Sequence, residues 1–243
     1  MKIILSGLSF LNFRKRKIEK FLYKNKIKYL ETIPKFLFKS KKIRLLYLQS
    51  TFFNFKSKNI SDHIAHFIKI SNLCQYYGIN NINIGSYPLR KLRNNKKSNI
   101  LINSNFIREI CQTAKNNNQI ISIEPIGKKY GNYFLSNHFD IVKFIKKEKI
   151  KNLRLLFDTG NFKKKSEYRK NFIKYKKFIH HIHISNYNLE ELNLNFIKDR
   201  IIFFKKNKFR KTITIEWLNK KNKIKEIKNL ISFLNNEFSF NRT

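Results

Sequence analysis

Four short apolar segments of this 243-residue chain end in side chains that can bind metal ions or move protons. The segments are residues 120–124, 153–158, 178–184 and 212–216, and the side chains are Glu124, Asp158, His183 and Glu216. Side chains alternate across a strand, so Glu124 shares a face with Ser122 and points away from Ile123. Carboxylate and imidazole ligands together suit one divalent ion such as Mn, Mg, Co, Fe or Zn. The sequence therefore predicts a site for one divalent metal ion.

Each of these four side chains also has an ordinary alternative role. Glu124 and Glu216 could be surface carboxylates, Asp158 could cap its own turn, and His183 could be a core histidine. The chain has only 15 acidic residues, however, and the two glutamates end apolar strands rather than lying in helices or loops. Because the four side chains occupy equivalent strand ends, we favour ligand or acid–base roles for them.

The remaining histidines are expected to serve structure more than chemistry. His181 lies two residues before His183 on the same strand face, one layer deeper, where it would support the site or pack. His180 should face the outer helices. His63, His66 and His138 fall in helical segments, where structural or exposed positions are expected.

Alternation of strands and helices along the chain predicts an α/β fold with a parallel sheet. In addition to the four segments above, strands are predicted at 2–7, 28–33, 43–50 and 81–86. Helices are predicted at 14–25, 61–77, 103–116, 136–148, 163–176, 189–200 and 223–235. Ser61 is the expected N-cap of the second helix and Gly78 its expected stop.

Eight strands, most of them followed by a helix, favour a single closed (β/α)8 TIM barrel over residues 1–243, since about 250 residues is the usual size. An open doubly wound sheet would carry a Gly-rich turn after its first strand, where only Gly7 is found. Only 3 Pro and 6 Gly are present, and no linker divides the chain. Reactive groups of such barrels lie at the C-terminal ends of strands, where the four candidate ligands also fall.

The net charge of +38 raises the question of nucleic-acid binding. Lys, Asn, Ile and Phe are abundant, and they share A/T-rich codons, which indicates a genomic bias. The Lys residues are scattered along the sequence rather than gathered in one stripe. Nucleic acid is therefore an unlikely partner in this interpretation.

Targeting and redox signals are weak. Cys74 and Cys111 are far apart in sequence and are expected to be buried free thiols. Residues 1–8 faintly resemble a signal peptide, but a first barrel strand explains them better. No apolar run approaches about 18 residues, so no membrane span is expected and a cytoplasmic location is predicted.

Several motifs in a fixed order resemble a known family. They are Ser122-Ile123-Glu124-Pro125, residues 130–134 (YGNYF), residues 156–161 (LFDTGN), residues 181–185 (HIHIS) and Thr214-Ile215-Glu216. Weaker similarities are Gln49-Ser50 and Gly85-Ser86 near Arg90. The chain resembles the sugar phosphate isomerase/epimerase family of xylose isomerase-like TIM barrels, which includes D-tagatose 3-epimerase-like enzymes.

This resemblance implies one divalent metal ion (Mn, Mg, Co or Zn) held by Glu124, Asp158, His183 and Glu216. Glu124 and Glu216 would also be the catalytic acid–base pair, exchanging a substrate proton through a metal-stabilised enediolate. The substrate would be a ketose or a sugar phosphate, and the protein a possible homo-oligomer. The residues expected to bind substrate are Gln49, Ser86, Arg90, Asn161 and His181.

Two positions depart from the family pattern. Asn161 stands where many relatives have His, and Leu189 where ketose epimerases often have Arg. Two alternatives stay open: an endonuclease IV-like DNA repair enzyme, and a catalytically degraded barrel kept as a binding protein.

Overall fold

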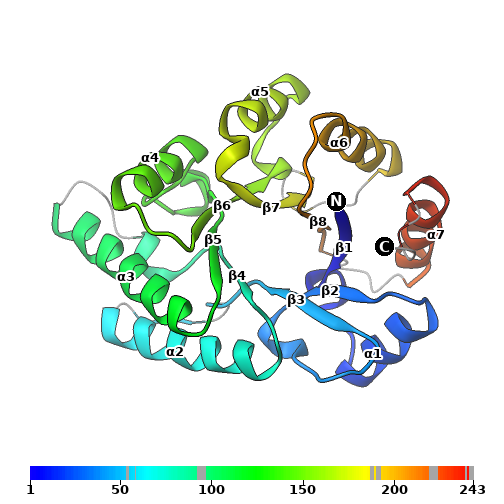
Figure 1. The fold of residues 1–243 in the computed structure, drawn as a ribbon, viewed down its shortest axis with the longest axis horizontal. Helices are drawn as coiled ribbons and strands as arrows, with labels where there is room; N and C mark the ends of the chain where they lie inside the picture. The colour runs from blue at the N-terminus through cyan, green and yellow to red at the C-terminus, as the bar shows by residue number, and fades with distance from the viewer. Residues whose placement is uncertain are drawn as a thin grey trace.

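The computed structural model describes residues 1–52, 55–57, 59–91, 97–186, 189, 193–218, 224–238 and 240. Eight parallel strands pair in sequence order, and the eighth pairs with the first, which closes a barrel (Figure 1). The strands are β1 (Lys2–Ser6), β2 (Tyr29–Thr32), β3 (Arg44–Leu48), β4 (Asn81–Ile84), β5 (Ile120–Ile123), β6 (Leu153–Asp158), β7 (Ile179–Ile184) and β8 (Thr212–Ile215). The predicted α/β TIM barrel is confirmed.

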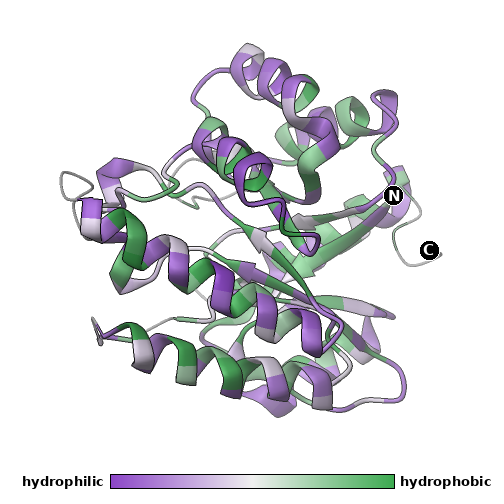
Figure 2. Ribbon diagram, turned by 60° about the vertical axis from the view of Figure 1, so that its left-hand side comes forward, coloured by the Kyte–Doolittle hydropathy of each residue, from purple (hydrophilic) through white to green (hydrophobic). Residues whose placement is uncertain are grey.

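Seven α-helices lie outside the ring of strands in the described part of the chain (Figure 1). They are α1 (Lys15–Lys24), α2 (Ile60–Tyr76), α3 (Lys97–Asn116), α4 (His138–Glu148), α5 (Lys165–Tyr175), α6 (Leu194–Lys206) and α7 (Ile224–Phe238). Hydrophobic and hydrophilic residues alternate along them (Figure 2), because one face packs on the barrel while the other meets water.

The connection between β2 and β3 has no α-helix. Residues 33–43 are all described, and they contain only a short 3-10 helix, η2 (Pro34–Phe36). This segment must return along the barrel in a few residues, and Pro34 lacks the N–H needed inside a helix. The barrel therefore has eight strands but lacks the helix that would normally follow the second.

Several helix ends differ from the sequence prediction, among them those of α2, α3 and α6. The N-cap of α2 is Asn59 rather than Ser61, and its side chain accepts a hydrogen bond of 3.0 Å from the Ser61 backbone N–H. Gly78 follows α2 with φ of +69°, as its predicted stop role requires. The third helix begins at residue 97 rather than 103. The sixth spans 194–206 rather than 189–200, and Asn193 caps its start.

The apolar core lies between strands and helices, whereas the interior of the barrel is polar. Cys74 and Cys111 are buried as predicted, and burial raises the pKa of each thiol to about 12. The prediction for His180 is wrong. Its Nε2 lies 2.8 Å from Oδ1 of Asn81 on β4, so the ring points into the barrel rather than toward the helices.

Among the described helices, none combines the length and the apolar character needed to cross a bilayer.

Candidate active site

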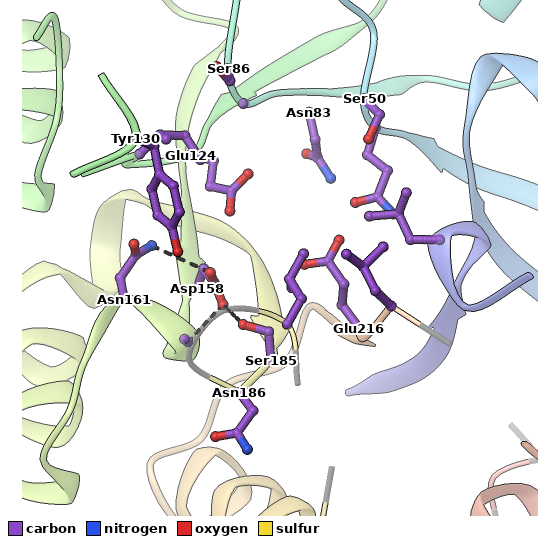
Figure 3. A pocket seen from close by; sticks show the side chains of 17 residues that line it. Ser50, Asn83, Ser86, Glu124, Tyr130, Asp158, Asn161, Ser185, Asn186 and Glu216 are labelled. Carbon is purple, nitrogen blue, oxygen red and sulfur yellow. Dashed lines mark hydrogen bonds between the residues drawn. The ribbon is translucent and has the colours of Figure 1, made fainter. Parts of the chain in front are cut away.

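A cavity of about 600 Å³ opens at the C-terminal ends of the strands (Figure 3). Most of its polar lining consists of carboxylates, amides and hydroxyls. The described lining residues are Leu8, Gln49, Ser50, Asn83, Gly85, Ser86, Glu124, Ile126, Tyr130, Asp158, Gly160, Asn161, Ser185, Asn186, Leu189, Glu216 and Leu218. This is where a barrel of this kind carries its chemistry.

Strand pairing brings the candidate ligands to one level. Asp158 and His183 are partners in the register of β6 and β7. Glu124 donates its backbone N–H to Ile84 at 2.9 Å, and Glu216 donates its backbone N–H to Ile184 at 3.0 Å. Both glutamates thus extend the ladder by one residue beyond their strands, and their side chains reach into the cavity (Figure 3).

Asp158 is held by three donors. Its Oδ1 accepts 2.5 Å and 2.9 Å hydrogen bonds from Ser185 Oγ and the Gly160 backbone N–H. Its Oδ2 lies 3.5 Å from Asn161 Nδ2. Burial and the neighbouring charge of Glu216 nevertheless raise the pKa of Asp158 to about 6. The carboxylate is therefore held in place in an environment short of positive charge.

Glu124 experiences the same environment. Burial raises its pKa well above the ordinary value, and the charges of Asp158 and Glu216 add to this effect. His183 and Arg90 act in the opposite direction but do not compensate. A divalent cation among these carboxylates would stabilise their ionised forms.

His183 is fully buried between two carboxylates. Its Nδ1 lies 3.1 Å from Glu216 Oε2, and its Nε2 lies 3.0 Å from both carboxylate oxygens of Glu31. Burial alone would lower the pKa of this imidazole, but the charges of Glu216 and Glu31 outweigh burial and raise it well above the ordinary value. His183, on β7, thus contacts side chains from β2 and from the end of β8.

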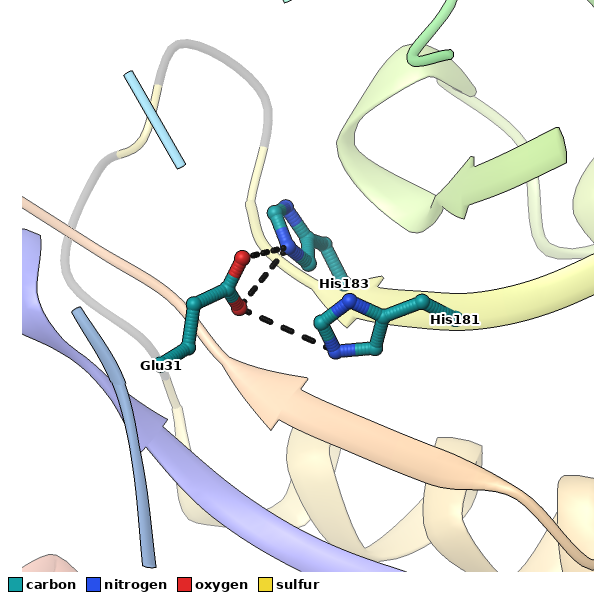
Figure 4. A group of neighbouring side chains, drawn as sticks. All are labelled: Glu31, His181 and His183. Carbon is teal, nitrogen blue, oxygen red and sulfur yellow. Dashed lines mark hydrogen bonds and ion pairs between the residues drawn. The ribbon is translucent and has the colours of Figure 1, made fainter. Parts of the chain in front are cut away.

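Glu31 was not predicted as part of the site. It lies on β2, is fully buried, and forms a group with His181 and His183 at the base of the site (Figure 4). A single acidic residue inside an apolar strand was the available signal. The structure adds what sequence spacing does not contain, namely that β2 faces β7 across the barrel interior.

The donor set fits a divalent metal ion. Among the described residues, only Glu31, His181 and His183 bring three ligand atoms within 4.8 Å of one another. However, His181 is committed elsewhere: its Nε2 lies 2.7 Å from Thr214 Oγ1 and its Nδ1 lies 2.8 Å from Asn83 Nδ2.

Of the four predicted ligands, Glu124, Asp158 and Glu216 line the cavity and His183 lies against Glu216, at wider spacing than the group formed by Glu31, His181 and His183. In the described structure, His183 Nδ1 is buried without a hydrogen bond of acceptable geometry, despite its proximity to Glu216. A metal ion bound at Nδ1 would replace the proton that the neighbouring carboxylates favour on this ring.

Three of the five residues expected to bind substrate line the cavity, namely Gln49, Ser86 and Asn161. Gln49 Nε2 donates to Ser6 Oγ at 2.5 Å, and Ser86 Oγ donates to the Asn132 side chain at 3.2 Å. These groups present amide and hydroxyl functions to a ligand.

Arg90 and His181, also expected to bind substrate, are absent from the described lining of the cavity. Arg90 is fully buried and donates to the carbonyls of Gly85, Glu124, Phe134 and Leu135 at 2.6–3.0 Å. Its guanidinium therefore connects the residues that follow β4 and β5 to residues 134–135. His181 lies beneath the cavity, stacked on Tyr47 with ring centroids 3.8 Å apart.

The chain belongs to the xylose isomerase-like TIM barrel family, whose model matches residues 22–237. No protein of curated function matches the sequence.

Solved structures share the fold at low identity. The probable 3-DHS dehydratase AsbF of Bacillus anthracis has a TM-score of 0.74 and 15% identity, over 96% of this chain and 98% of that chain. The 3-keto-D-glucoside 4-epimerase YcjR of E. coli has a TM-score of 0.72 and 13% identity, over 100% of this chain and 99% of that chain. An AP endonuclease of family 2 from Brucella melitensis has a TM-score of 0.72 and 12% identity, over 96% of this chain and 97% of that chain. These likenesses show the fold.

Proposed function

We propose that this protein is a divalent-metal-dependent isomerase or epimerase acting on a sugar. One observation carries the proposal: Glu124, Asp158 and Glu216 meet His183 at the strand ends of a barrel whose family and fold are established. In a chain of net charge +38, this buried acidic cluster is the natural place for a cation.

Glu124, Asp158, His183 and Glu216 would hold the metal ion. When bound, the ion would polarise a carbonyl and its neighbouring hydroxyl. Glu124 and Glu216 enter the cavity from different strands, β5 and β8, and would remove and return the proton on the carbon next to the carbonyl. Return to the opposite face gives an epimer, and return to the neighbouring carbon gives an isomer.

The lining favours an uncharged sugar over a sugar phosphate. No Lys or Arg is among the described residues that line the cavity, although the chain has 53 of them. Arg90, the basic residue expected near the substrate, is already bonded to four backbone carbonyls. Amides and hydroxyls such as Gln49, Asn161 and Ser185 suit the hydroxyl groups of a neutral ketose.

The endonuclease alternative is less well supported. A multi-metal site would require additional His or acidic ligands, and His63, His66 and His138 all lie on helices outside the described cavity lining. A binding protein without activity is the second alternative. It would bind a ligand but would not convert a sugar, whereas the proposed enzyme would. The possible homo-oligomer and the cytoplasmic location stay predictions.

Proton exchange tests the proposal directly. The Mn²⁺-loaded protein is incubated with neutral ketoses in D₂O, and NMR follows the replacement of the proton next to the carbonyl. We expect exchange in wild type and a loss of about 10²-fold or more in Glu124→Gln and in Glu216→Gln. Glu109→Gln, which removes an exposed carboxylate from α3, is the matched control and should retain wild-type exchange.

Two results would contradict the proposal. Cleavage of abasic DNA by the same preparation, without ketose exchange, would favour the endonuclease. Metal binding without exchange in any ketose or ketose phosphate tested would favour the inactive binding protein.

A further inference from the structure

Glu31 is a buried carboxylate that the proposed reaction does not use. It lies on β2 below the cavity and is absent from the described lining. A buried carboxylate is costly unless charged or polar partners satisfy it, so its partners indicate its role. Those partners are His183, Asn83 and His181.

We propose that Glu31 is a positioning residue that fixes the tautomer and ring orientation of His183, so that Nδ1 is the nitrogen offered to a metal ion. The inference rests on the proposed metal-dependent function. It assigns a role to a residue that neither the sequence motifs nor the cavity lining identify.

The contact between Glu31 and His183 determines that Nε2 of the imidazole carries a hydrogen. His183 Nε2 lies 3.0 Å from each Glu31 oxygen (Figure 4), and a carboxylate only accepts, so Nε2 carries the hydrogen. When a metal ion takes the place of a proton on the other nitrogen, Nε2 keeps its hydrogen and the other nitrogen supplies its lone pair. That nitrogen, Nδ1, is the one facing Glu216 Oε2 at 3.1 Å.

A second set of contacts holds Glu31 itself. Asn83 Nδ2 lies 2.6 Å from Glu31 Oε1 and 2.8 Å from His181 Nδ1, so it donates to both. His181 therefore accepts at Nδ1 and carries its hydrogen on Nε2, which lies 2.7 Å from Thr214 Oγ1 and 3.7 Å from Glu31 Oε2. Burial lowers the pKa of His181 well below the ordinary value, consistent with this neutral ring.

These contacts form a network in which the two histidines have different roles. Hydrogen bonds use both ring nitrogens of His181, whereas Nδ1 of His183 faces only Glu216, itself a candidate ligand, among the described residues. A carboxylate behind a metal-binding imidazole orients the ring and makes it a better ligand. Glu31 is in the position to do this.

The substitution Glu31→Gln tests the inference with little change in shape. One carboxylate oxygen becomes an amide N–H₂ group, which would face the N–H groups of His183 and His181 and could no longer accept from them. We expect the dissociation constant for Zn²⁺, measured by isothermal titration, to rise about 10- to 100-fold. Glu109→Gln, with the same charge change on the surface, should bind Zn²⁺ as wild type does.

A measurement on the unmodified protein makes the test independent of how the variant folds. Long-range ¹H–¹⁵N NMR of the Zn²⁺-loaded wild type should show His183 with hydrogen on Nε2 and Zn²⁺ on Nδ1. Zn²⁺ on Nε2, or an unchanged dissociation constant in a folded Glu31→Gln variant, would overturn the role of Glu31 alone. Failure of wild type to bind Zn²⁺ at all would instead remove the proposed metal-dependent function on which it rests.

Discussion

Buried polar side chains with complete sets of partners hold the individual residues of this site in place. Arg90 illustrates this, because its fully buried guanidinium forms no ion pair with a described residue and donates to backbone carbonyls instead. One of those carbonyls belongs to Glu124. The geometry of a candidate catalytic residue therefore depends on a residue that does not touch the cavity.

Replacing Arg90 with Lys should destabilise the protein. Lysine keeps the charge but lacks the planar set of donors, so at least one buried carbonyl would lose its partner, at a cost of about 1–3 kcal/mol. Urea unfolding measures this change. Arg108→Lys is the control, because its pair with Glu148 is exposed and should contribute less than about 1 kcal/mol. Equal losses in the two variants would contradict the structural role of Arg90.

His138 should make stability depend on pH. Burial lowers its pKa to about 3, whereas the unfolded chain would take up the proton near pH 6.5. Because the unfolded state binds more protons below that value, stability falls as the pH falls from about 6.5 toward 3.

The variant His138→Phe isolates this contribution. Between about pH 7 and pH 5, its free energy of unfolding should fall by about 2 kcal/mol less than that of wild type, as measured by urea unfolding at both pH values. His180 and His181, whose pKa values are also lowered by burial, would maintain the remaining slope. An identical pH slope in wild type and variant would show that the pKa of His138 is the same in the folded and unfolded protein.

The sequence predicted the residues at the strand ends but not the side chains behind them. Glu124, Asp158 and Glu216 line one cavity, and His183 contacts Glu216, because strand ends of a barrel converge. Glu31 could not be placed, since its contact with His183 spans 152 positions and depends on which strands face each other. Arg90 looked like a substrate contact because short-range pattern does not show the direction of a side chain.

At the scale of elements, strand ends and the turns that follow them determine the shape of the site. Thr159, Gly160 and Asn161 form a 3-10 turn directly after β6, and this turn packs against the end of β7. Within this turn, Gly160 lies closest to the residues that follow β7. A Cβ at this position would clash with Ser185 Oγ and lie 2.8 Å from the Asn186 carbonyl oxygen. Ser185 is also a donor to Asp158.

Gly160→Ala should therefore displace Ser185 and weaken metal binding by Asp158. We expect a lower melting temperature and a higher dissociation constant for Mn²⁺. Gly127→Ala is the matched control, because its Cβ would have only one neighbour within 4 Å, the Lys129 side chain at 3.9 Å, and its φ of −64° suits alanine. Wild-type Mn²⁺ affinity in Gly160→Ala would show that the two strand ends are not coupled through this turn.

Element order was predictable because each strand and helix has its own periodicity. Helix ends were less predictable. The helix α3 begins at Lys97, six residues before the predicted start. The prediction missed these residues because their sequence, KSNILI, gives no strong helix signal. The start of α6 lies at Leu194 because Asn193 supplies a side-chain cap to its first turn.

For the whole molecule, the fold gathers charge that looks scattered in the sequence. The connections that enter the strands at the N-terminal end of the barrel include residues 25–28, 37–43, 149–152, 176–178 and 207–211. Together they carry twelve Lys or Arg and no Asp or Glu. The acidic site lies at the opposite end of the barrel, so its carboxylates do not neutralise these basic residues.

Such a molecule should be stabilised by salt. Raising NaCl from about 10 mM to about 0.1 M shortens the screening length from about 30 Å to about 10 Å, which weakens repulsion among like charges. We expect the melting temperature to rise by about 2 °C or more over this range. A melting temperature that is constant or falls would mean that repulsion among these charges does not limit stability.

The central claim is that the four strand-end residues bind one divalent metal ion, and metal content tests it most directly. Mass spectrometry of the Mn²⁺-reconstituted protein should give about one ion per chain in wild type and clearly less in Glu216→Gln and His183→Ala. Glu109→Gln, with its carboxylate on the surface of α3, should match wild type. Wild type without bound metal, or variants that retain a full ion, would contradict the site described for this barrel.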